Sequence, residues 1–346
     1  MLLAILALYF YAPVAPGATR TFDVPTLLAA AQTFSDPLKV WLFWGFFFAF
    51  AIKVPMFPFH TWLPDAHTEA PTAGSVVLAG VLLKMGTYGF LRFSLPLLPV
   101  DPVLRSRIIQ VVIVLSLVAI VYGALVCLMQ KDMKRLIAYS SVSHLGFCTL
   151  GIFALTPNGL AGSVIQQINH GISTGALFLI VGVLYERRHT RMISDFGGLA
   201  TPMPNFAAIY LIISLSSLGM PLLNGFIGEF TILQGAFQVS KAWAAWGVLG
   251  VILGAAYLLW LYQRVMFGPV TLPVNEHLPD LNLRELATLV PLVFIAFWIG
   301  IYPKPFFAII EKPVENIVRQ VNPNFYPAQQ AKLPPSAVAR AMAEAK

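Results

Sequence analysis

Two lysines flank a proline-rich interruption within one apolar part of the chain. Lys53 ends the run WLFWGFFFAFAIK, Pro55 and Pro58 follow it, and Lys84 lies in the next apolar run, VLAGVLLKMGTYGF. Proline lacks the amide hydrogen and clashes with the preceding turn, so we expect the helix to break after Lys53. A charged side chain costs about 2.5–3.5 kcal/mol at the centre of a membrane helix on insertion scales. Charges beside a broken helix therefore predict an ion or proton pathway.

The composition places the chain in a membrane. Of its 346 residues, 58% are hydrophobic and 11% are charged, whereas soluble domains average about 25% charged residues. The net charge of +7 comes from basic residues scattered among short loops. This distribution sets membrane orientation and does not indicate nucleic-acid binding. The loops near 130–135 and 186–203 are rich in lysine and arginine, so we expect both on the cytoplasmic side.

Segments of about 20 apolar residues, long enough to cross a bilayer, recur through most of the chain. Residues 1–12 form a shorter apolar stub, residues 13–37 are expected to form a loop, and the polar segment after Glu311 is expected to have no core of its own. The spans are predicted at 36–57, 72–95, 107–129, 136–155, 160–185, 204–240, 243–267 and 285–310.

The span over 204–240 is too long for one straight helix. It is interrupted at Gly219-Met220-Pro221 and near Asn224-Gly225, and it ends in GFIGEF, which contains Glu229. Two interrupted helices in corresponding positions are typical of inverted-repeat transporters. The predicted fold is therefore an all-α polytopic membrane protein, an inverted-repeat helix bundle with two broken transmembrane helices.

This fold divides the chain into four parts. We expect a helix stub and loop first, then the remainder of a first repeat, a complete second five-helix repeat, and a last transmembrane helix with a polar tail. The respective boundaries are 1–35, 36–100, 101–270 and 271–346.

Five titratable side chains are expected inside the membrane. Lys53 lies beside a break, and Lys84 has apolar neighbours on both sides, where burial favours the neutral amine and allows proton exchange. His144 and His170 lie in adjacent spans, and histidine titrates closest to neutrality. A hydrogen-bonded core histidine is the plainer alternative for each. Glu229 is the only acid in its long apolar run, so it is either paired or protonated.

Other polar residues receive plainer interpretations. Asp132, beside Lys134 and Arg135, is expected to fix a helix end. The segment 60–69, which holds His60, Asp65, His67 and Glu69, is expected to be a solvated loop, with an access path as the less favoured alternative. The polar residues near the two central histidines are expected to form hydrogen bonds or to hold water. These are Ser140, Ser141, Ser143, Gln166 and Asn169.

The sequence contains no pattern that would hold a redox group. Cys127 and Cys148 lie in apolar runs and are expected to be buried thiols. We find no CxxC, no Gly-rich nucleotide loop and no haem or iron–sulfur pattern. The central histidines lack a third ligand with metal spacing, which argues against a metal site. Any electrons are therefore expected to travel in other chains.

Three long stretches resemble a known family. KVPMFPFHTWLPDAHTEAPTAGSVVLAGVLLKMGTYGFLRF, DMKRLIAYSSVSHLGF and LYERRHTRMISDFGGL are similar to the antiporter-like membrane subunits of respiratory complex I. Within that family, LYERRHTR is most similar to the subunit M, or chain 4, type. The resemblance implies two inverted repeats with a proton relay of lysines and acids at mid-membrane depth. Five residues occupy the positions of that relay: Lys53, Lys84, His144, His170 and Glu229.

The resemblance also implies a function and a setting. It implies a proton-translocating membrane-arm subunit of an NADH:quinone oxidoreductase in the inner (plasma) membrane. No cofactor is expected in this chain, because NADH, FMN, Fe–S clusters and quinone would be bound by partner subunits. The expected partners are other membrane-arm subunits of complex I and the lipid bilayer, with no nucleic acid and only indirect contact with quinone.

The chain departs from the family at one point. The family has a further glutamate upstream, paired with the lysine of the first broken helix, and the stub over 1–12 contains no acid. We therefore expect the chain to correspond to about the C-terminal two-thirds of such a subunit, and not to pump protons alone, since a buried lysine without its carboxylate tends to lose its proton.

Two alternatives to this function stay open. A subunit of a multisubunit Na+/H+ antiporter or of a membrane-bound hydrogenase would have the same fold, and partner subunits or sodium dependence would separate these from the first interpretation. A scaffold that transports nothing is the second alternative. A scaffold would gain nothing from the insertion cost of several buried titratable groups.

Overall fold

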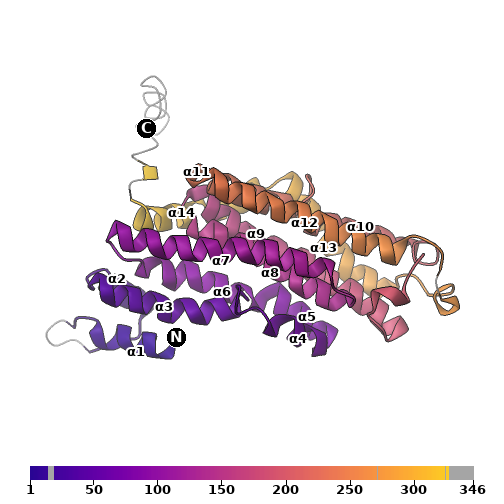
Figure 1. The fold of residues 1–346 in the computed structure, drawn as a ribbon, viewed down its shortest axis with the longest axis horizontal. Coiled ribbons are helices and arrows are strands. Elements are labelled where there is room, and N and C mark those ends of the chain that lie inside the picture. The colour runs from indigo at the N-terminus through magenta and orange to yellow at the C-terminus, as the bar shows by residue number, and fades with distance from the viewer. Residues whose placement is uncertain (15–18, 271, 324, 327–346) are drawn as a thin grey trace, which may run out of the picture.

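The computed structural model describes residues 1–14, 19–270, 272–323 and 325–326. Within these residues the regular secondary structure is entirely helical, and the helices form an elongated bundle (Figure 1). The α-helices are α1 (Leu2–Tyr11), α2 (Val24–Ala31), α3 (Asp36–Lys53), α4 (Trp62–Glu69), α5 (Thr72–Val77), α6 (Lys84–Gly89), α7 (Pro102–Leu128), α8 (Met133–Phe153), α9 (Pro157–Arg188), α10 (Pro204–Ser217), α11 (Asn224–Val239), α12 (Lys241–Met266), α13 (Leu283–Ile301) and α14 (Lys304–Val321).

One membrane-spanning segment is assembled from several short turns. α5 and α6, with the turns beside them, form a single apolar span over Thr72–Leu97. Two π-helical turns, Leu78–Leu82 and Phe90–Ser94, and one 3-10 turn, Leu95–Leu97, interrupt its α geometry. Single π-turns inside helices are frequent at functional sites because they displace backbone groups from their regular partners.

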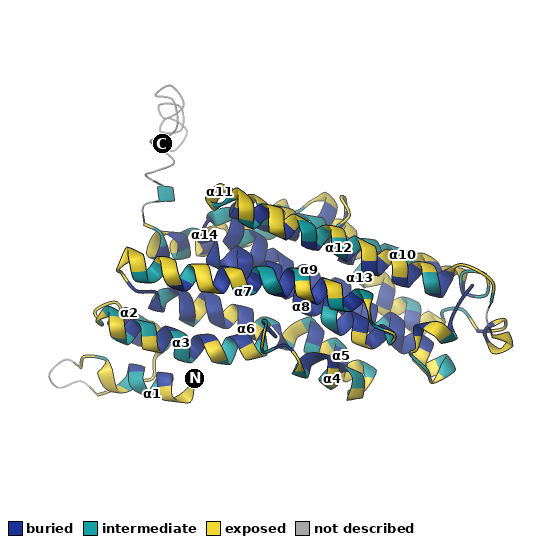
Figure 2. Cartoon of the chain, in the orientation of Figure 1, coloured by how far each residue is buried: buried dark blue, intermediate teal, exposed yellow. Residues whose placement is uncertain are grey.

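The helices α8 and α9 form the centre of the bundle. In the most apolar stretch of α8, 94% of the residues are buried, whereas in the corresponding stretch of α13 only 28% are buried. Figure 2 shows the buried residues gathered along α8 and α9, while α7 and α12 turn exposed faces outward. Within the described residues, six helical segments are long and apolar enough to cross a membrane. The chain is therefore a multi-pass membrane protein.

The central helices begin at residues whose side chains cap them. Asp132 accepts hydrogen bonds from the backbone amides of Lys134 and Arg135 at the start of α8, and Thr156 accepts one from a backbone amide of α9. Such a cap contributes about 1 kcal/mol. Asp132 also forms an ion pair with Arg191, with 3.2 Å between Oδ2 and Nε. The prediction that the Asp132 cluster fixes a helix end is confirmed.

Both predicted helix breaks are present. α3 ends at Lys53, and the short helix α4 begins at Trp62. α10 ends at Ser217, and α11 begins at Asn224. Between them Gly219 has φ +81°, a conformation that glycine adopts without steric cost. Each break leaves backbone groups free of helical partners, and these must be satisfied inside the protein.

The predicted loop near the N-terminus is partly helical. Residues 13–37 contain α2, which starts after Asp23 because this side chain accepts a hydrogen bond from the backbone amide of Thr26. Leu27 and Ala31 of this helix are buried. The prediction of a continuous loop was therefore wrong.

The last predicted span is also shorter than expected. The helix predicted over 285–310 ends at Ile301, and α14 follows as a separate helix with Pro303 at its N-cap position. α14 runs beyond Glu311 and buries three valines against the bundle. The polar segment therefore has a packed face as far as Val321. Residues 327–346 of the predicted tail lie outside the described residues.

Glycines bring α9 and α11 close together. A Cβ atom added at Gly162 would lie 2.6 Å from the backbone nitrogen of Ile232, and one added at Gly235 would lie 2.2 Å from the backbone nitrogen of Gly159. Backbone atoms cannot move aside as a flexible side chain can. Small residues at such contacts are typical of membrane helices, whose association depends on close packing. This contact sets how deeply the side chains of α11 reach between α8 and α9.

We expect Gly235→Ala to destabilise the protein by about 1–3 kcal/mol, because the added methyl group overpacks a backbone contact. Gly175→Ala is the matched control on α9, since its nearest atom, Val76 Cγ1, would lie at an ordinary 3.9 Å. The difference in stability between the two variants is measured from their thermal unfolding midpoints in detergent. Equal unfolding midpoints for the two variants would contradict this account of the α9–α11 contact.

Candidate functional site

Four titratable side chains from four different helices form a connected series in the middle of the bundle. Lys84 Nζ lies 2.7 Å from His170 Nδ1. The rings of His170 and His144 have centroids 5.8 Å apart, and His144 Nδ1 lies 2.8 Å from Glu229 Oε1. The structure thus brings together four of the five residues that the sequence singled out, from α6, α9, α8 and α11.

The π-turn before α6 positions Lys84. The side chain turns back and donates a hydrogen bond to the carbonyl of Ala79, in the π-helical turn Leu78–Leu82. It also donates to His170 Nδ1. An ammonium group among apolar side chains needs such partners, because burial without them carries a high cost. The irregular turn therefore supplies a backbone acceptor where a regular helix would have none.

The carboxylate of Glu229 is held by side chains from two neighbouring helices. Its Oε1 lies 2.8 Å from His144 Nδ1 and accepts a hydrogen bond of 3.1 Å from Gln166 Nε2. Gln166 can approach because the preceding residue of α11 is glycine: a Cβ atom at Gly228 would lie 2.2 Å from Gln166 Oε1. The other oxygen, Oε2, faces Gly219 in the helix break. The two glycines therefore make room for the acid.

Two asparagines tie the second helix break to α9. Asn169 Nδ2 donates to the backbone carbonyl of Asn224 at 2.6 Å, and Asn224 Nδ2 donates to the carbonyl of Asn169 at 3.3 Å. Ser216 Oγ, at the end of α10, donates to Asn224 Oδ1 at 2.5 Å. These bonds satisfy groups that the break exposes, as buried backbone requires. They also fix the start of α11, and hence Glu229, relative to α9.

His144 is suited to pass a proton because both of its ring nitrogens have partners. Nδ1 contacts Glu229, and Nε2 lies 3.2 Å from the hydroxyl of Tyr257. In the neutral tautomer with hydrogen on Nδ1, the ring donates to the carboxylate and accepts from Tyr257. When both nitrogens carry hydrogen, the ring donates to both partners. The environment thus accommodates either protonation state.

His170 is bonded on one side only. Its Nδ1 accepts from Lys84, so the neutral ring carries its hydrogen on Nε2. That atom is buried and has no hydrogen-bond partner among the described residues. Buried polar atoms of this kind are usually satisfied by an internal water.

Lys53, the fifth predicted residue, lies at the end of α3 and is half-buried. Among the described residues it has no hydrogen bond or ion pair, so the structure does not join it directly to the other four. The end of α3 does pack against α6: a Cβ atom added at Gly86 would lie 2.6 Å from Val54 Cγ2. Lys53 is therefore next to the segment that carries Lys84 without touching its ammonium group.

The polar neighbours of the histidines have divided roles. The three serines of α8 bond to backbone carbonyls: Ser140 and Ser141 to Ile137, and Ser143 to Ile120. The two amides of α9 contact the site, because Gln166 binds Glu229 and Asn169 binds Asn224. Hydrogen bonding or water binding was expected for all five, and the structure shows hydrogen bonds from each of them.

The segment expected to be a solvated loop is partly buried instead. His60 is 3% exposed, and His67, on α4, is 0% exposed. His67 stacks on Phe178 of α9 with ring centroids 4.4 Å apart. The helix α4 packs closely against α8, which removes these rings from solvent although the surrounding sequence is polar. The prediction of solvated histidines was therefore wrong.

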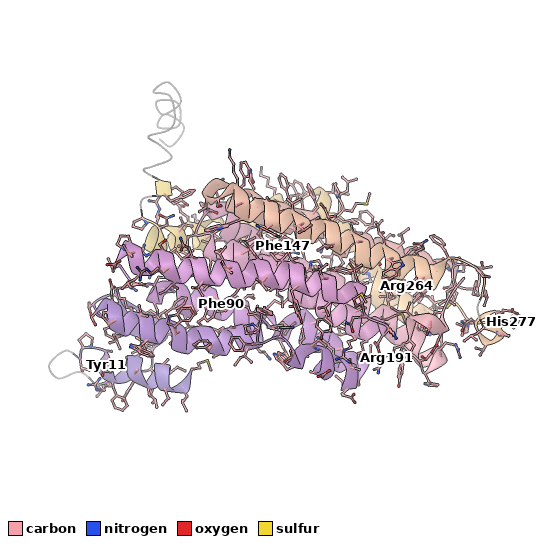
Figure 3. The ribbon with its side chains drawn as sticks, in the orientation of Figure 1. Tyr11, Phe90, Phe147, Arg191, Arg264 and His277 are labelled. Atoms are coloured by element: carbon pink, nitrogen blue, oxygen red, sulfur yellow. The ribbon has the colours of Figure 1, made fainter. Side chains whose placement is uncertain are left out.

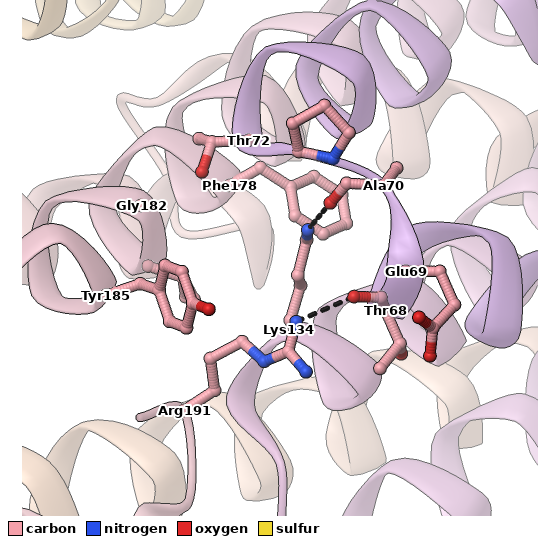
Figure 4. Close-up of a pocket in the computed structure, with 11 residues that line it drawn as sticks. Thr68, Glu69, Ala70, Thr72, Lys134, Phe178, Gly182, Tyr185 and Arg191 are labelled. Atoms are coloured by element: carbon pink, nitrogen blue, oxygen red, sulfur yellow. Dashed lines mark hydrogen bonds between the residues drawn. The ribbon is translucent and has the colours of Figure 1, made fainter. Parts of the chain in front are cut away.

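A pocket of about 250 Å³ opens beside this segment (Figure 4). Lys134 reaches across it to donate to the carbonyl of Ala70, and Arg191 donates to the carbonyl of Thr68 at 2.7 Å. Both carbonyls lie where α4 ends and α5 begins. The sequence analysis placed Lys134 in a loop cluster. In the structure its side chain is buried and its hydrogen bond to Ala70 ties α8 to the junction between α4 and α5.

Sequence reasoning missed two further buried groups. Tyr257 of α12 contacts His144, yet it stands in an apolar run with no spacing that distinguishes it. Lys39 of α3 is 1% exposed and donates to the carbonyl of Gln32 at 3.1 Å. An isolated lysine near a helix start resembles a surface charge in the sequence, and only the structure of the turn from α2 into α3 shows its burial.

This arrangement is suited to proton transfer. Its groups are amine, imidazole and carboxylate, all of which gain and lose protons, and neighbouring titratable groups of this kind influence each other's charge. Within the part of the chain that the structure describes, no three His, Cys, Asp or Glu side chains gather as a metal ion would require. Intramembrane titratable groups in a connected series are typical of proton relays.

Comparisons with known proteins agree with this geometry. The family described as NADH:quinone oxidoreductase/Mrp antiporter, TM matches residues 1–254. The NADH-quinone oxidoreductase subunit M of Rhodobacter capsulatus is 46% identical over 335 residues, which are 96% of this chain and 65% of the relative. The subunit M of Rickettsia typhi (strain ATCC VR-144 / Wilmington) is 46% identical over 299 residues, which are 86% of this chain and 60% of the relative.

A solved structure shows the same fold. A chain of respiratory complex I from Thermus thermophilus with bound NADH is similar with a TM-score of 0.84 and 35% identity, over 93% of this chain and 66% of that chain. The present chain thus spans less than two-thirds of the length of each of these relatives. Because the family match covers most of its residues, the chain belongs to the NADH:quinone oxidoreductase/Mrp antiporter family of membrane proteins.

Proposed function

We propose that this chain forms part of a proton-translocating membrane subunit of an NADH:quinone oxidoreductase. The observation that carries the proposal is the series of half-buried Lys84 with buried His170, His144 and Glu229, which has contacts of 2.7 Å at one end and 2.8 Å at the other. The identity of 46% to relatives named as subunit M supports the same function.

In the proposed relay a proton moves along these groups by successive hydrogen-bond exchange. The Lys84 ammonium gives a proton to His170 Nδ1, and His170 releases the proton on Nε2 toward His144. His144 in turn transfers a proton from Nδ1 to the carboxylate of Glu229. Each transfer changes the charge at one group and therefore alters the proton affinity of the next. The reverse order of the same steps moves a proton the other way.

Lys53 is proposed as the outer member of this relay. Since it makes no direct contact with Lys84, water has to connect the two amines. The proximity of the end of α3 to α6 supports this assignment, as does the position of Lys53 beside the first helix break.

The redox chemistry is proposed to reside in partner subunits. NADH, FMN, Fe–S clusters and quinone would be bound there, and this chain would contact other membrane-arm subunits of complex I and the bilayer. The bacterial relatives support a location in the inner membrane. Coupling would then occur when events in the partners change the charge near Lys53 or Lys84.

The rival function is sodium/proton exchange, because the family description also names Mrp antiporters. The relatives named as subunit M favour the oxidoreductase. Identification of the subunits that co-purify with the chain would separate the two, as would the sodium dependence of transport. A scaffold without transport is opposed by the cost of placing four titratable groups inside the membrane.

We expect Glu229→Gln to abolish most proton pumping in sealed vesicles while the complex still assembles. Glutamine keeps the shape and the contact to His144 but cannot exchange a proton. Glu315→Gln, an acid on the surface helix α14, is the matched control and is expected to pump normally. Pumping is measured as acidification per quinone reduced. A Glu229→Gln complex that pumps like the control would refute the relay.

We expect Lys84→Arg to fail as a substitute for lysine. Arginine stays protonated, so it preserves the positive charge but not the exchange of a proton with His170. Both Lys84→Ala and Lys84→Arg are expected to lower pumping and the coupled quinone reduction together. Lys241→Ala removes an exposed lysine at the start of α12 and serves as the control. Normal turnover of the arginine variant would show that charge alone suffices at this position.

A further inference from the structure

A second row of buried polar groups leads away from the relay along α10. Tyr210, Ser214 and Ser217 stand at helical spacings of four and three residues, so their side chains lie on one face of α10. All three are buried, at 1%, 0% and 3% exposure. None of their hydroxyl oxygens has a hydrogen-bond partner among the described residues. Three consecutive orphaned hydroxyls on one helix face are far from the usual pattern of satisfied buried polar groups.

The inner end of this row meets the relay. Ser217 is the last residue of α10, and Gly219 in the following break lies directly against Glu229 Oε2. His144 and Gln166 both contact Oε1, so Oε2 is the oxygen that faces the break after α10. A helix rises 1.5 Å per residue, so the row from Tyr210 to Ser217 covers about 10 Å of membrane depth.

The outer end of the row meets a cationic pocket near the end of α12. The Tyr210 ring packs on Tyr262 of α12 with centroids 5.4 Å apart. Two residues further along α12, Arg264 places its guanidinium 3.9 Å from the ring centroid of Trp260, and its Nη2 is buried without a partner. Arg264 also lines a pocket of about 520 Å³ with Lys131 and Ser194. In Figure 3 Arg264 lies toward the end of the bundle that carries Arg191 and His277.

We propose that the hydroxyl face of α10, formed by Tyr210, Ser214 and Ser217, holds a file of water molecules that connects Glu229 with the aqueous phase at the Arg264 end. This inference rests on the proposed function, because it assigns the file to proton exchange by the same acid. The hydroxyls both donate and accept hydrogen bonds, so they hold waters in a row without needing to titrate.

The file gives Glu229 a proton route separate from the histidines. A proton taken up at the Arg264 end passes from water to water along the three hydroxyls and reaches Oε2, while His144 serves Oε1. One carboxylate thus joins two routes on its two oxygens. The basic side chains of Lys131 and Arg264 at the outer end repel free cations, so the route favours transfer between hydrogen-bonded waters over passage of a hydrated metal cation.

Radiolytic footprinting of the assembled complex tests for the water directly. A short X-ray pulse forms hydroxyl radicals from bound water, and these oxidise side chains next to it. We expect Tyr210 to be modified although it is 1% exposed. Phe206, one turn earlier on the same face and 0% exposed, is the matched control and is expected to stay unmodified. An unmodified Tyr210 would overturn the water file whatever the pumping activity.

Proton transfer through the file is tested with Ser214→Val, which fills the middle of the row with apolar atoms, and with Ser214→Ala in case valine prevents folding. We expect the pumping rate to fall roughly tenfold, which corresponds to about 1.4 kcal/mol, and the Tyr210 footprint to weaken in the valine variant. Thr149→Val is the control, because its buried hydroxyl bonds to the carbonyl of Gly146 and lies outside the row.

The outcomes separate this inference from the proposed function. A modified Tyr210 together with normal pumping by both Ser214 variants would show water without a transport role and would overturn the proton route. If Glu229→Gln also pumped normally, the proposed function itself would fail, while the footprint would still decide whether water lines α10.

Discussion

The contact between His144 and Glu229 is the interaction on which the centre of this protein depends. A carboxylate inside a membrane must be paired or protonated, and here it is placed 2.8 Å from an imidazole and 3.1 Å from an amide. That placement requires α11 to approach α8 and α9 closely. Glycines in α9 and α11 permit the approach, and the Asn169–Asn224 bonds fix the start of α11. The close approach of α11 to α8 and α9 therefore accounts both for the packing at the centre of the bundle and for the pairing of the Glu229 carboxylate.

Irregular backbone accompanies both end members of the proposed relay. Lys84 follows a π-helical turn and bonds to one of its carbonyls, and Glu229 faces the break between α10 and α11. A regular membrane helix uses all of its backbone groups internally. An interruption releases some of them at mid-depth, where they serve as partners for an ion or for water. The two irregular sites lie on different segments, and the histidines of α8 and α9 connect them.

Much of this arrangement was predictable because charge and helix breakers are conspicuous in an apolar chain. Pro55, Pro58 and Gly219 indicated the breaks, and Lys84 and Glu229 stood out among apolar neighbours. The fold class followed from the same signals, whereas the family was indicated by the resemblance of three long stretches to known membrane subunits. Boundaries were less predictable where a capped turn or a proline shifted a helix end, as at α2 and α14.

The parts that were not predictable depend on contacts between distant segments. Tyr257 resembles any aromatic residue of a membrane helix until α12 is placed beside α8. His67 lies in a polar sequence, and its burial results from the packing of α4 against α8 and α9. Lys53 stands beside a predicted helix break, but among the described residues it has no hydrogen bond or ion pair that joins it to Lys84. Side-chain direction and helix packing are tertiary properties that residue spacing does not encode.

The central claim is that Lys84 and Glu229 belong to one coupled series. Infrared titration of the Glu229 carboxyl band, identified by its loss in Glu229→Gln, measures that coupling without turnover. The account predicts that the titration midpoint of this band moves in Lys84→Ala and stays in place in Lys241→Ala, because only the first substitution removes a charge from the series. A midpoint that is the same in both variants would contradict it.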